Sequence, residues 1–208
     1  DPQFLARSLA KLPKGVVISH GNLAAFLRWI QDFYPAEDFR GLLAVTTFAF
    51  DISVFELFGT LCSGGTICLG DDPLALLNPQ VREAYAGKLS FLCSVPSAAV
   101  AWLDAQVIPA GIRTVNMGGE FLPQALVERL YQAGVGRVLD LWGPTEDTTY
   151  SMVALRTAGG LPHIGKPIRD TRMWVLDARQ QPVPRGVKGE LILGGFGLSK
   201  GYLNAPAL

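Results

Sequence analysis

The sequence predicts an α/β fold, in which a largely parallel sheet flanked by helices is followed by a small antiparallel, barrel-like β portion. Two observations support this prediction. Between residues 42 and 141, short apolar runs alternate with helix-like segments over short connections. Such alternation is typical of parallel strands whose connecting helices cover both faces of the sheet. After about residue 150, strand-like runs follow one another through turns with no helix between them.

Length and composition narrow the class of protein. The chain has 208 residues, of which 49% are hydrophobic, and 18 basic side chains balance 18 acidic ones. We expect an α/β subdomain over residues 1–150 and a partial β-rich subdomain over residues 151–208. Zero net charge gives no electrostatic case for nucleic acid or an anionic membrane as partner. With no apolar run near the roughly 20 residues of a membrane span and no signal-peptide layout, we expect a cytoplasmic protein with free thiols.

Short apolar runs bounded by glycine, proline or polar residues define the expected strands. Five of them should form the parallel sheet, at residues 42–47, 66–69, 89–93, 112–116 and 138–141. Two more, at residues 173–177 and 189–193, are separated by a turn-rich segment. These two should pair with each other or close a barrel-like portion.

The expected helices have recognisable ends. One begins after Asn22, because apolar residues then recur at the i, i+3, i+4, i+7 spacing of a single helix face. The next runs to about residue 61, with Asp51 or Ser53 as its N-cap. A third covers residues 98–105. The last carries Pro123 in its first turn, where proline is tolerated.

Chemically useful side chains gather where the expected parallel strands end. Asp51 follows the first strand, Cys93 closes the third, residues 118–120 follow the fourth, and residues 142–146 follow the fifth. In parallel α/β sheets, ligands bind beyond the carboxyl ends of the strands. We therefore expect these segments to converge on one site.

The segment at residues 142–146 has the chemistry of a nucleotide site. The flat ring of Trp142 can stack on a nucleobase, and the Thr145 hydroxyl can donate to phosphate. The Glu146 carboxylate can hold the Mg²⁺ that accompanies nucleotide phosphates. Gly143 and Pro144 fix the backbone between the ring and the acidic group.

Two other motifs are incomplete. Residues 160–167 nearly fit G-x-x-x-x-G-K-[ST], but Pro167 stands where the hydroxyl residue is needed and no helix signal follows. Residues 197–201 read G-x-S-x-G, the turn that presents a hydrolase serine, but both histidines lie upstream of it. Both segments are better explained as turns.

Five segments in order then resemble motifs of the adenylate-forming (ANL) superfamily, and of nonribosomal peptide synthetase adenylation domains in particular. They are residues 13–23, 50–56, 116–120, 142–146 and 189–203, which cover nearly the whole chain from Pro13. The resemblance identifies the chain as the N-terminal core of such a ligase. It implies that an amino acid and ATP give aminoacyl-AMP and pyrophosphate, and that the acyl group passes to phosphopantetheine on a peptidyl carrier protein. Peptide antibiotics are typical products of this family.

The resemblance also assigns roles to residues. Trp142 should stack on adenine, Asp140 should accept from the adenine amino group, Thr145 should contact phosphate as a catalytic residue, and Glu146 should be catalytic as the Mg²⁺ ligand. The implied ATP-binding residues are Gly118, Gly119, Glu120, Asp140, Leu141, Trp142, Gly143 and Thr145. Glycine at positions 118 and 119 lets the backbone approach the nucleotide closely.

Asp51 has two interpretations, as a helix N-cap or as the partner of the substrate α-ammonium group, and the motif favours the second. The implied amino-acid pocket consists of Asp51, Ile52, Phe55, Cys93, Asn116, Gly118, Leu141, Thr149 and Tyr150. Its bulky members leave limited room and it carries no second charge. We therefore expect a small neutral substrate, alanine or glycine first. The alternative is that Phe55 and Tyr150 point away from the pocket as core residues.

The chain also departs from the family pattern. The glycine-rich phosphate loop expected before Pro13 is replaced by residues 6–12, so either the loop has been left out of this sequence or phosphate binding is impaired. The lysine-bearing subdomain should follow Leu208, and we expect these residues alone to adenylate poorly. A degenerate docking module and an acyl-CoA ligase remain alternative functions. An MbtH-like helper protein is a further possible partner.

Overall fold

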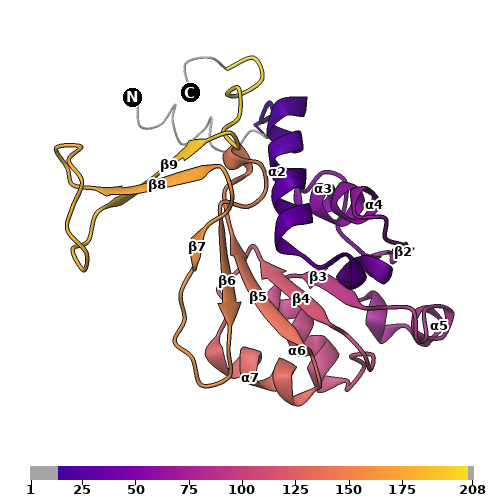
Figure 1. Ribbon diagram of the computed structural model, residues 1–208. Coiled ribbons are helices and arrows are strands. Elements are labelled where there is room, and N and C mark those ends of the chain that lie inside the picture. Colours follow the sequence, from indigo (N-terminus) through magenta and orange to yellow (C-terminus); the bar gives the residue numbers. More distant parts are fainter. Residues whose placement is uncertain (1–13, 206–208) are drawn as a thin grey trace, which may run out of the picture.

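A computed structural model describes residues 14–205 of the chain (Figure 1). The helices are α2 (His20–Phe33), α3 (Ile52–Val54), α4 (Thr60–Cys62), α5 (Pro79–Ala84), α6 (Pro96–Asp104) and α7 (Gln124–Gln132). Single turns of 3₁₀-helix form η1 (Ala36–Arg40), η3 (Ala75–Leu77) and η4 (Thr145–Asp147), and η2 (Phe55–Gly59) is a π-helix. The strands are β1 (Leu42–Ala44), β2 (Ile67–Leu69), β3 (Phe91–Ser94), β4 (Thr114–Gly118), β5 (Arg137–Trp142), β6 (Met152–Arg156), β7 (Lys166–Pro167), β8 (Thr171–Leu176) and β9 (Glu190–Gly195).

The strands form two sheets, as the sequence predicts. The main sheet has seven strands in the order β2-β1-β3-β4-β5-β6-β7, and β8 pairs with β9 in a separate antiparallel sheet. Strands β2, β1, β3, β4 and β5 are parallel. Each parallel connection needs a crossover, which the intervening helical segments supply. The predicted α/β class is confirmed.

Strands β6 and β7 are additions that the sequence analysis did not predict. Strand β6 pairs antiparallel with β5, and β7 pairs antiparallel with β6. The main sheet therefore runs on to Pro167, and the second sheet starts at Thr171. The expected boundary at residue 150 falls inside the turn that leads from β5 to β6, and the division into two subdomains stays a prediction.

The main sheet is covered on both faces (Figure 1). One face packs against α6 and α7 through aliphatic residues, with Trp102 among them. The other face packs against α2 and η2 and is rich in aromatic rings. We call this second cluster the aromatic core; its members are Phe26, Trp29, Ile30, Tyr34, Phe39, Leu42, Ala44, Ile52, Phe55, Phe91, Cys93, Leu139, Leu141, Tyr150 and Ile168. The β8–β9 hairpin projects from the side of the main sheet.

Three helix starts differ from expectation. Helix α2 begins three residues before the expected residue, because Ser19 is its N-cap and Asn22 completes the capping box. Asp51 lies at the N-cap position of α3, but its side chain makes no capping hydrogen bond. Pro123 is the N-cap of α7 and lies just outside the first turn. Across residues 14–205, no helix has both the length and the apolar character needed to cross a membrane.

Candidate functional site

The largest cavity of the described residues lies at the carboxyl ends of β4 and β5. Its volume is about 540 Å³, and we call it the Trp142 cavity. The indole of Trp142 closes β5 and is 39% exposed, so one part of the ring is free to meet a ligand. The lining residues are Gly119, Glu120, Phe121, Leu122, Asp140, Leu141, Trp142, Gly143, Arg156, Pro162, His163 and Ile164.

Glycines allow the backbone to pack closely around this cavity. A Cβ atom on Gly118 would lie 3.2 Å from the Leu141 carbonyl oxygen, and one on Gly143 would lie 2.5 Å from the Ser151 nitrogen. Gly119 has a φ of +78°, a conformation that favours glycine. The predicted reason for glycine at position 118, close backbone approach, fits this geometry.

Arg156 is a buried residue of the site that the sequence analysis missed. Its Nη1 atom donates to Asp140 Oδ2 at 2.6 Å and to the Leu122 carbonyl at 3.2 Å. Burial raises the pKa of Asp140, and the bond to Arg156 offsets part of that rise. One carboxylate oxygen of Asp140 is therefore already bound by the protein. No local signal marked Arg156, because its role depends on the pairing of β6 with β5.

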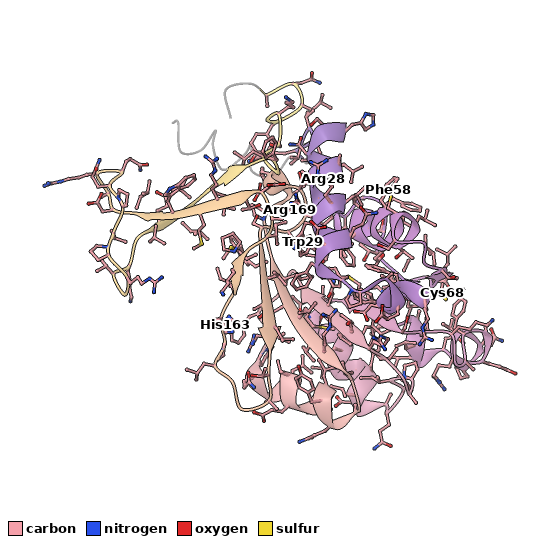
Figure 2. The ribbon with its side chains drawn as sticks, viewed as in Figure 1. Arg28, Trp29, Phe58, Cys68, His163 and Arg169 are labelled. Atoms are coloured by element: carbon pink, nitrogen blue, oxygen red, sulfur yellow. The ribbon has the colours of Figure 1, made fainter. Side chains whose placement is uncertain are left out.

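The connection between β6 and β7 forms a wall of the Trp142 cavity. Pro162, His163 and Ile164 come from this loop, and Figure 2 labels His163 on it. These residues belong to the segment that nearly matches a phosphate-binding loop. A short strand, β7, follows the loop in place of a helix, so the helix N-terminus that such a loop needs is missing. The segment at residues 6–12, which stands where the family has its phosphate loop, lies outside the described residues.

A second cavity, of about 210 Å³, holds Asp51, and we call it the Asp51 cavity. It is lined by Ile18, Ser19, His20, Leu23, Asp51, Val54, Phe58, Thr145, Thr148 and Thr149. Within residues 14–205 the Asp51 carboxylate has no hydrogen-bond or ion-pair partner, while its backbone carbonyl accepts from Thr149 Oγ1 at 3.3 Å. A half-buried carboxylate without a protein partner can receive a cationic group of a ligand.

One segment, residues 142–149, lines both cavities. Trp142 and Gly143 belong to the first cavity, and Thr145 and Thr149 belong to the second. Glu146 lies between them in sequence and lines neither; its Oε1 atom accepts a hydrogen bond from the Tyr202 hydroxyl. That bond to the carboxylate raises the pKa of Tyr202. The structure thus places Asp51 and the segment that carries Glu146 on the same side of the molecule.

The predicted pocket residues Phe55, Cys93, Asn116 and Tyr150 come together in the aromatic core. They are between 0% and 2% exposed and pack closely. The Cys93 sulfur lies 3.9 Å from the Tyr150 hydroxyl, and the Phe55 and Tyr150 rings are 6.0 Å apart. Burial raises the pKa of both the Cys93 thiol and the Tyr150 hydroxyl, so both stay neutral. Ile52 and Leu141 belong to the same cluster.

Glu120 lines the Trp142 cavity and also anchors α6. Its two carboxylate oxygens accept from the Ser97 backbone nitrogen at 3.0 Å and from the Ser97 hydroxyl at 2.9 Å. Because Ser97 lies in the first turn of α6, this carboxylate satisfies a free N–H group of the helix start. A direct role of Glu120 toward a nucleotide stays a prediction.

A comparison with protein families decides the class. The model of the family described as AMP-binding enzyme matches residues 12–203. The chain belongs to the AMP-binding enzyme family. One component of the linear gramicidin synthase of Brevibacillus parabrevis is 44% identical to this AMP-binding enzyme chain over 95% of its length. The synthetase AmbB of Pseudomonas aeruginosa, described as an AMB antimetabolite synthetase, is 45% identical over 93%. The chain spans only 4% and 16% of the lengths of these two relatives.

Solved structures of nonribosomal peptide synthetases share the fold of this AMP-binding enzyme chain. One is holo-AB3403, a four-domain synthetase bound to AMP and glycine, with a TM-score of 0.83 and 35% identity over 94% of this chain and 15% of its own. Another is FmoA3 bound to AMPPNP, with a TM-score of 0.83 and 28% identity over 93% and 22%. The predicted resemblance to the adenylation domains of nonribosomal peptide synthetases is confirmed.

Proposed function

We propose that this chain is the substrate- and nucleotide-binding part of a longer ATP-dependent ligase that activates an amino acid for nonribosomal peptide synthesis. In this reaction an oxygen of the amino-acid carboxylate bonds to the α-phosphorus of ATP. The bond from that phosphorus to the bridging oxygen breaks, and pyrophosphate leaves with the electron pair. The observation that carries the proposal is the segment at residues 142–149, which lines the Trp142 cavity and the Asp51 cavity together.

The Trp142 cavity suits an adenine ring. The half-exposed Trp142 indole offers a stacking surface at the end of β5. Asp140 lies two residues before it, with Oδ2 held by Arg156 at 2.6 Å. We propose that the remaining oxygen of Asp140 accepts from the adenine amino group. Arg156 then serves as a positioning residue, because it fixes the orientation of that carboxylate.

Glu146 is the proposed ligand of Mg²⁺. Among residues 14–205 no group of three or more His, Cys, Asp or Glu side chains is arranged to hold a metal ion. One carboxylate is sufficient for this role, because Mg²⁺ at nucleotide sites is bound through one or two carboxylates together with substrate phosphates. The ion offsets the negative charge of the phosphates during attack on the α-phosphorus. Thr145, the residue before Glu146, is the proposed phosphate contact.

Asp51 is the proposed partner of the substrate α-ammonium group. Its carboxylate has no partner in residues 14–205 and makes no capping bond, which favours this role over a helix cap. Charge-assisted pairs of this kind contribute about 1.5–3 kcal/mol. The tight packing of Phe55 and Tyr150 supports a small neutral substrate such as alanine or glycine. The bound glycine of holo-AB3403 belongs to that protein and agrees with this direction.

The proposed partners follow from the same relatives. The structure of holo-PA1221, which contains adenylation and PCP domains, is similar to this chain with a TM-score of 0.80 and 25% identity over 94% of it. We propose that the activated acyl group passes to phosphopantetheine on a carrier protein, in a cytoplasmic enzyme. An MbtH-like helper is a further proposed partner that no contact in residues 14–205 addresses.

Amino-acid-dependent exchange of pyrophosphate into ATP tests the proposal in the intact polypeptide that contains this chain. We expect exchange with alanine or glycine and none with acetate. Exchange with acetate alone would identify an acyl-CoA ligase, because Asp51 would then have no ammonium group to bind. Absence of both exchange and nucleotide-dependent thermal stabilisation would identify a degenerate docking module. Phenylalanine or lysine exceeding alanine would contradict the small-substrate proposal alone.

A further inference from the structure

Tyr34 contacts two residues of the proposed amino-acid pocket from the side of the sheet that α2 covers. It is the C-cap of α2 and is only 4% exposed. Its ring centroid lies 5.5 Å from that of Phe55, in an edge-on arrangement. Its hydroxyl lies 3.0 Å from Nδ2 and 3.3 Å from Oδ1 of Asn116. Tyr34 is not among the nine pocket positions that the family resemblance supplied.

Asn116 has hydrogen-bonding capacity left over. The amide is fully buried in β4, and the Tyr34 hydroxyl is its only side-chain partner in residues 14–205. A side-chain amide has two donors and an oxygen with two lone pairs, so a single hydroxyl satisfies only part of it. Buried polar groups are normally satisfied. The unused part of the Asn116 amide is therefore available to the neighbouring pocket, and Tyr34 fixes its orientation.

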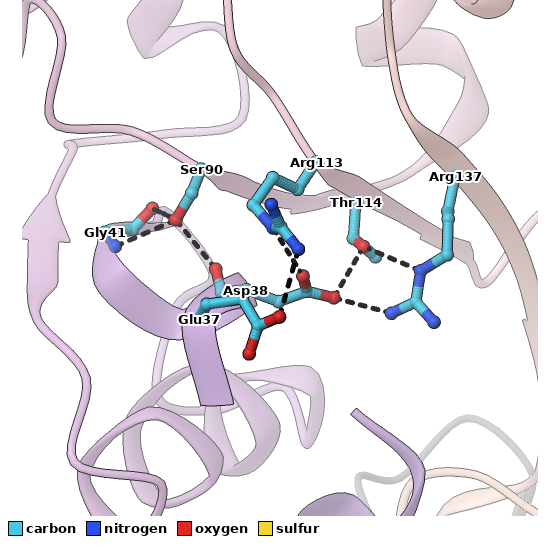
Figure 3. A network of polar contacts seen from close by, with 7 residues as sticks. All are labelled: Glu37, Asp38, Gly41, Ser90, Arg113, Thr114 and Arg137. Carbon is cyan, nitrogen blue, oxygen red and sulfur yellow. Dashed lines mark hydrogen bonds and ion pairs between the residues drawn. The ribbon is translucent and has the colours of Figure 1, made fainter. Parts of the chain in front are cut away.

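A buried polar network holds Tyr34 in place from the other side (Figure 3). Asp38, which is 2% exposed, accepts from Arg113 at 2.9 Å, from Thr114 at 2.8 Å and from Arg137 at 2.5 Å. The Arg137 guanidinium lies over the Tyr34 ring, 5.8 Å from its centroid. This cation–π contact and the bond to Asp38 leave the ring no free space on that side.

Tyr34 stays neutral in this environment. Burial raises its pKa far above the ordinary range of tyrosine, and the bond to Asn116 opposes only part of that rise. The Phe39 and Phe91 rings lie 5.7 Å and 5.6 Å from the Tyr34 ring. The deep end of the pocket is thus closed by a rigid, uncharged aromatic ring.

From these contacts we infer that Tyr34 is a specificity-determining residue that sets the upper size limit of the substrate side chain. Its ring fills the space below Phe55 and Asn116 into which a longer side chain would extend. Its hydroxyl orients the amide that faces the pocket. The inference rests on the proposed function, because it requires that this pocket holds an amino acid.

Pyrophosphate exchange in the intact polypeptide tests the inference with Tyr34→Leu. Shortening the ring to a branched chain opens the deep end, so the ratio of kcat/KM for leucine to that for alanine should rise about tenfold or more. Tyr34→Phe keeps the ring and should retain the wild-type ratio. Tyr85→Leu is the matched control, since Tyr85 packs against the opposite face of the sheet and bonds to the Leu69 carbonyl. It should leave the ratio unchanged.

Each outcome separates the inference from the proposed function. Exchange that persists in Tyr34→Leu with an unchanged leucine-to-alanine ratio overturns the role of Tyr34 and leaves the proposed function standing. A wild-type protein that already prefers leucine overturns the size limit. A wild-type protein with no amino-acid-dependent exchange overturns both. Tyr34→Met, which fills similar volume with a flexible chain, provides the same comparison if the leucine variant does not fold.

Discussion

The Trp142 ring provides the clearest test of the nucleotide site at the scale of one residue. We expect Trp142→Ala to raise the KM for ATP roughly 5- to 150-fold, because stacking of a base on an aromatic side chain contributes about 1–3 kcal/mol. Trp174→Ala is the matched control, since Trp174 on β8 is 42% exposed against 39% for Trp142. Pyrophosphate exchange at varied ATP concentration measures the effect. An equal loss in both variants would show that Trp142 does not bind the base.

The sequence predicted single residues well where their neighbours lie close along the chain. Asp51, Asp140 and Trp142 each follow or end a strand, and the carboxyl edge of a parallel sheet brings such positions together. Arg156 and Tyr34 were missed for the opposite reason. Arg156 reaches Asp140 only because β6 pairs with β5, and Tyr34 reaches Asn116 across 82 positions of sequence. No local pattern encodes either contact.

At the scale of elements, the π-helix η2 anchors the loop that leads to Asp51. Glu56 in η2 is 1% exposed, and its carboxylate accepts from the Thr46 backbone nitrogen at 3.0 Å and the Thr46 hydroxyl at 2.9 Å. Thr46 directly follows the buried segment at β1. The sequence predicted one regular helix here, but extra residues in a helical turn are set by packing, and propensity does not encode them.

The buried Glu56 carboxyl makes the stability of this element depend on pH. Burial raises its pKa above the ordinary value of 4.5, so the native state binds the proton more tightly than the unfolded state does. The resulting stabilisation is present below pH 4.5 and is lost as pH rises through the raised pKa. We therefore expect Glu56→Gln to gain stability relative to wild type between about pH 4 and pH 8. Chemical denaturation at both pH values measures this difference. Glu83→Gln removes an exposed carboxyl from α5 as a control, and an identical trend in both variants would contradict the assignment.

At the scale of the whole molecule, the two sheets are joined largely by polar contacts near the start of α2. The Ser199 nitrogen donates to the Glu146 carbonyl at 2.7 Å, and the Thr148 hydroxyl donates to the Gly197 carbonyl at 2.6 Å. The segment after β9 therefore lies against η4, which carries the proposed metal ligand. The sequence predicted the class of both sheets, but it could not predict this docking, because the turn residues involved carry no periodic pattern.

Asn22 links the two parts directly, and its removal should loosen the smaller one. The Asn22 side chain accepts from the Ser19 nitrogen at 2.9 Å and donates to the carbonyls of Phe196 and Leu198 at 2.6 Å and 2.9 Å. A two-stranded hairpin is marginally stable by itself, so it depends on such attachments. We expect Asn22→Ala to speed amide hydrogen exchange in residues 190–203 and to leave β3, β4 and β5 protected.

The control for this experiment is Asn78→Ala. Asn78 caps α5 through the Gln80 nitrogen at 3.0 Å and makes no long-range side-chain bond in residues 14–205. Its loss should cost about 1 kcal/mol of local helix stability without changing exchange in residues 190–203. If Asn22→Ala left that segment as protected as in the wild type, the side-chain bonds of Asn22 would not be what attaches it. The backbone pairing of Val17 with Gly201 and Lys200 would then carry the attachment, and the smaller sheet would be held by the strand-like segment before α2.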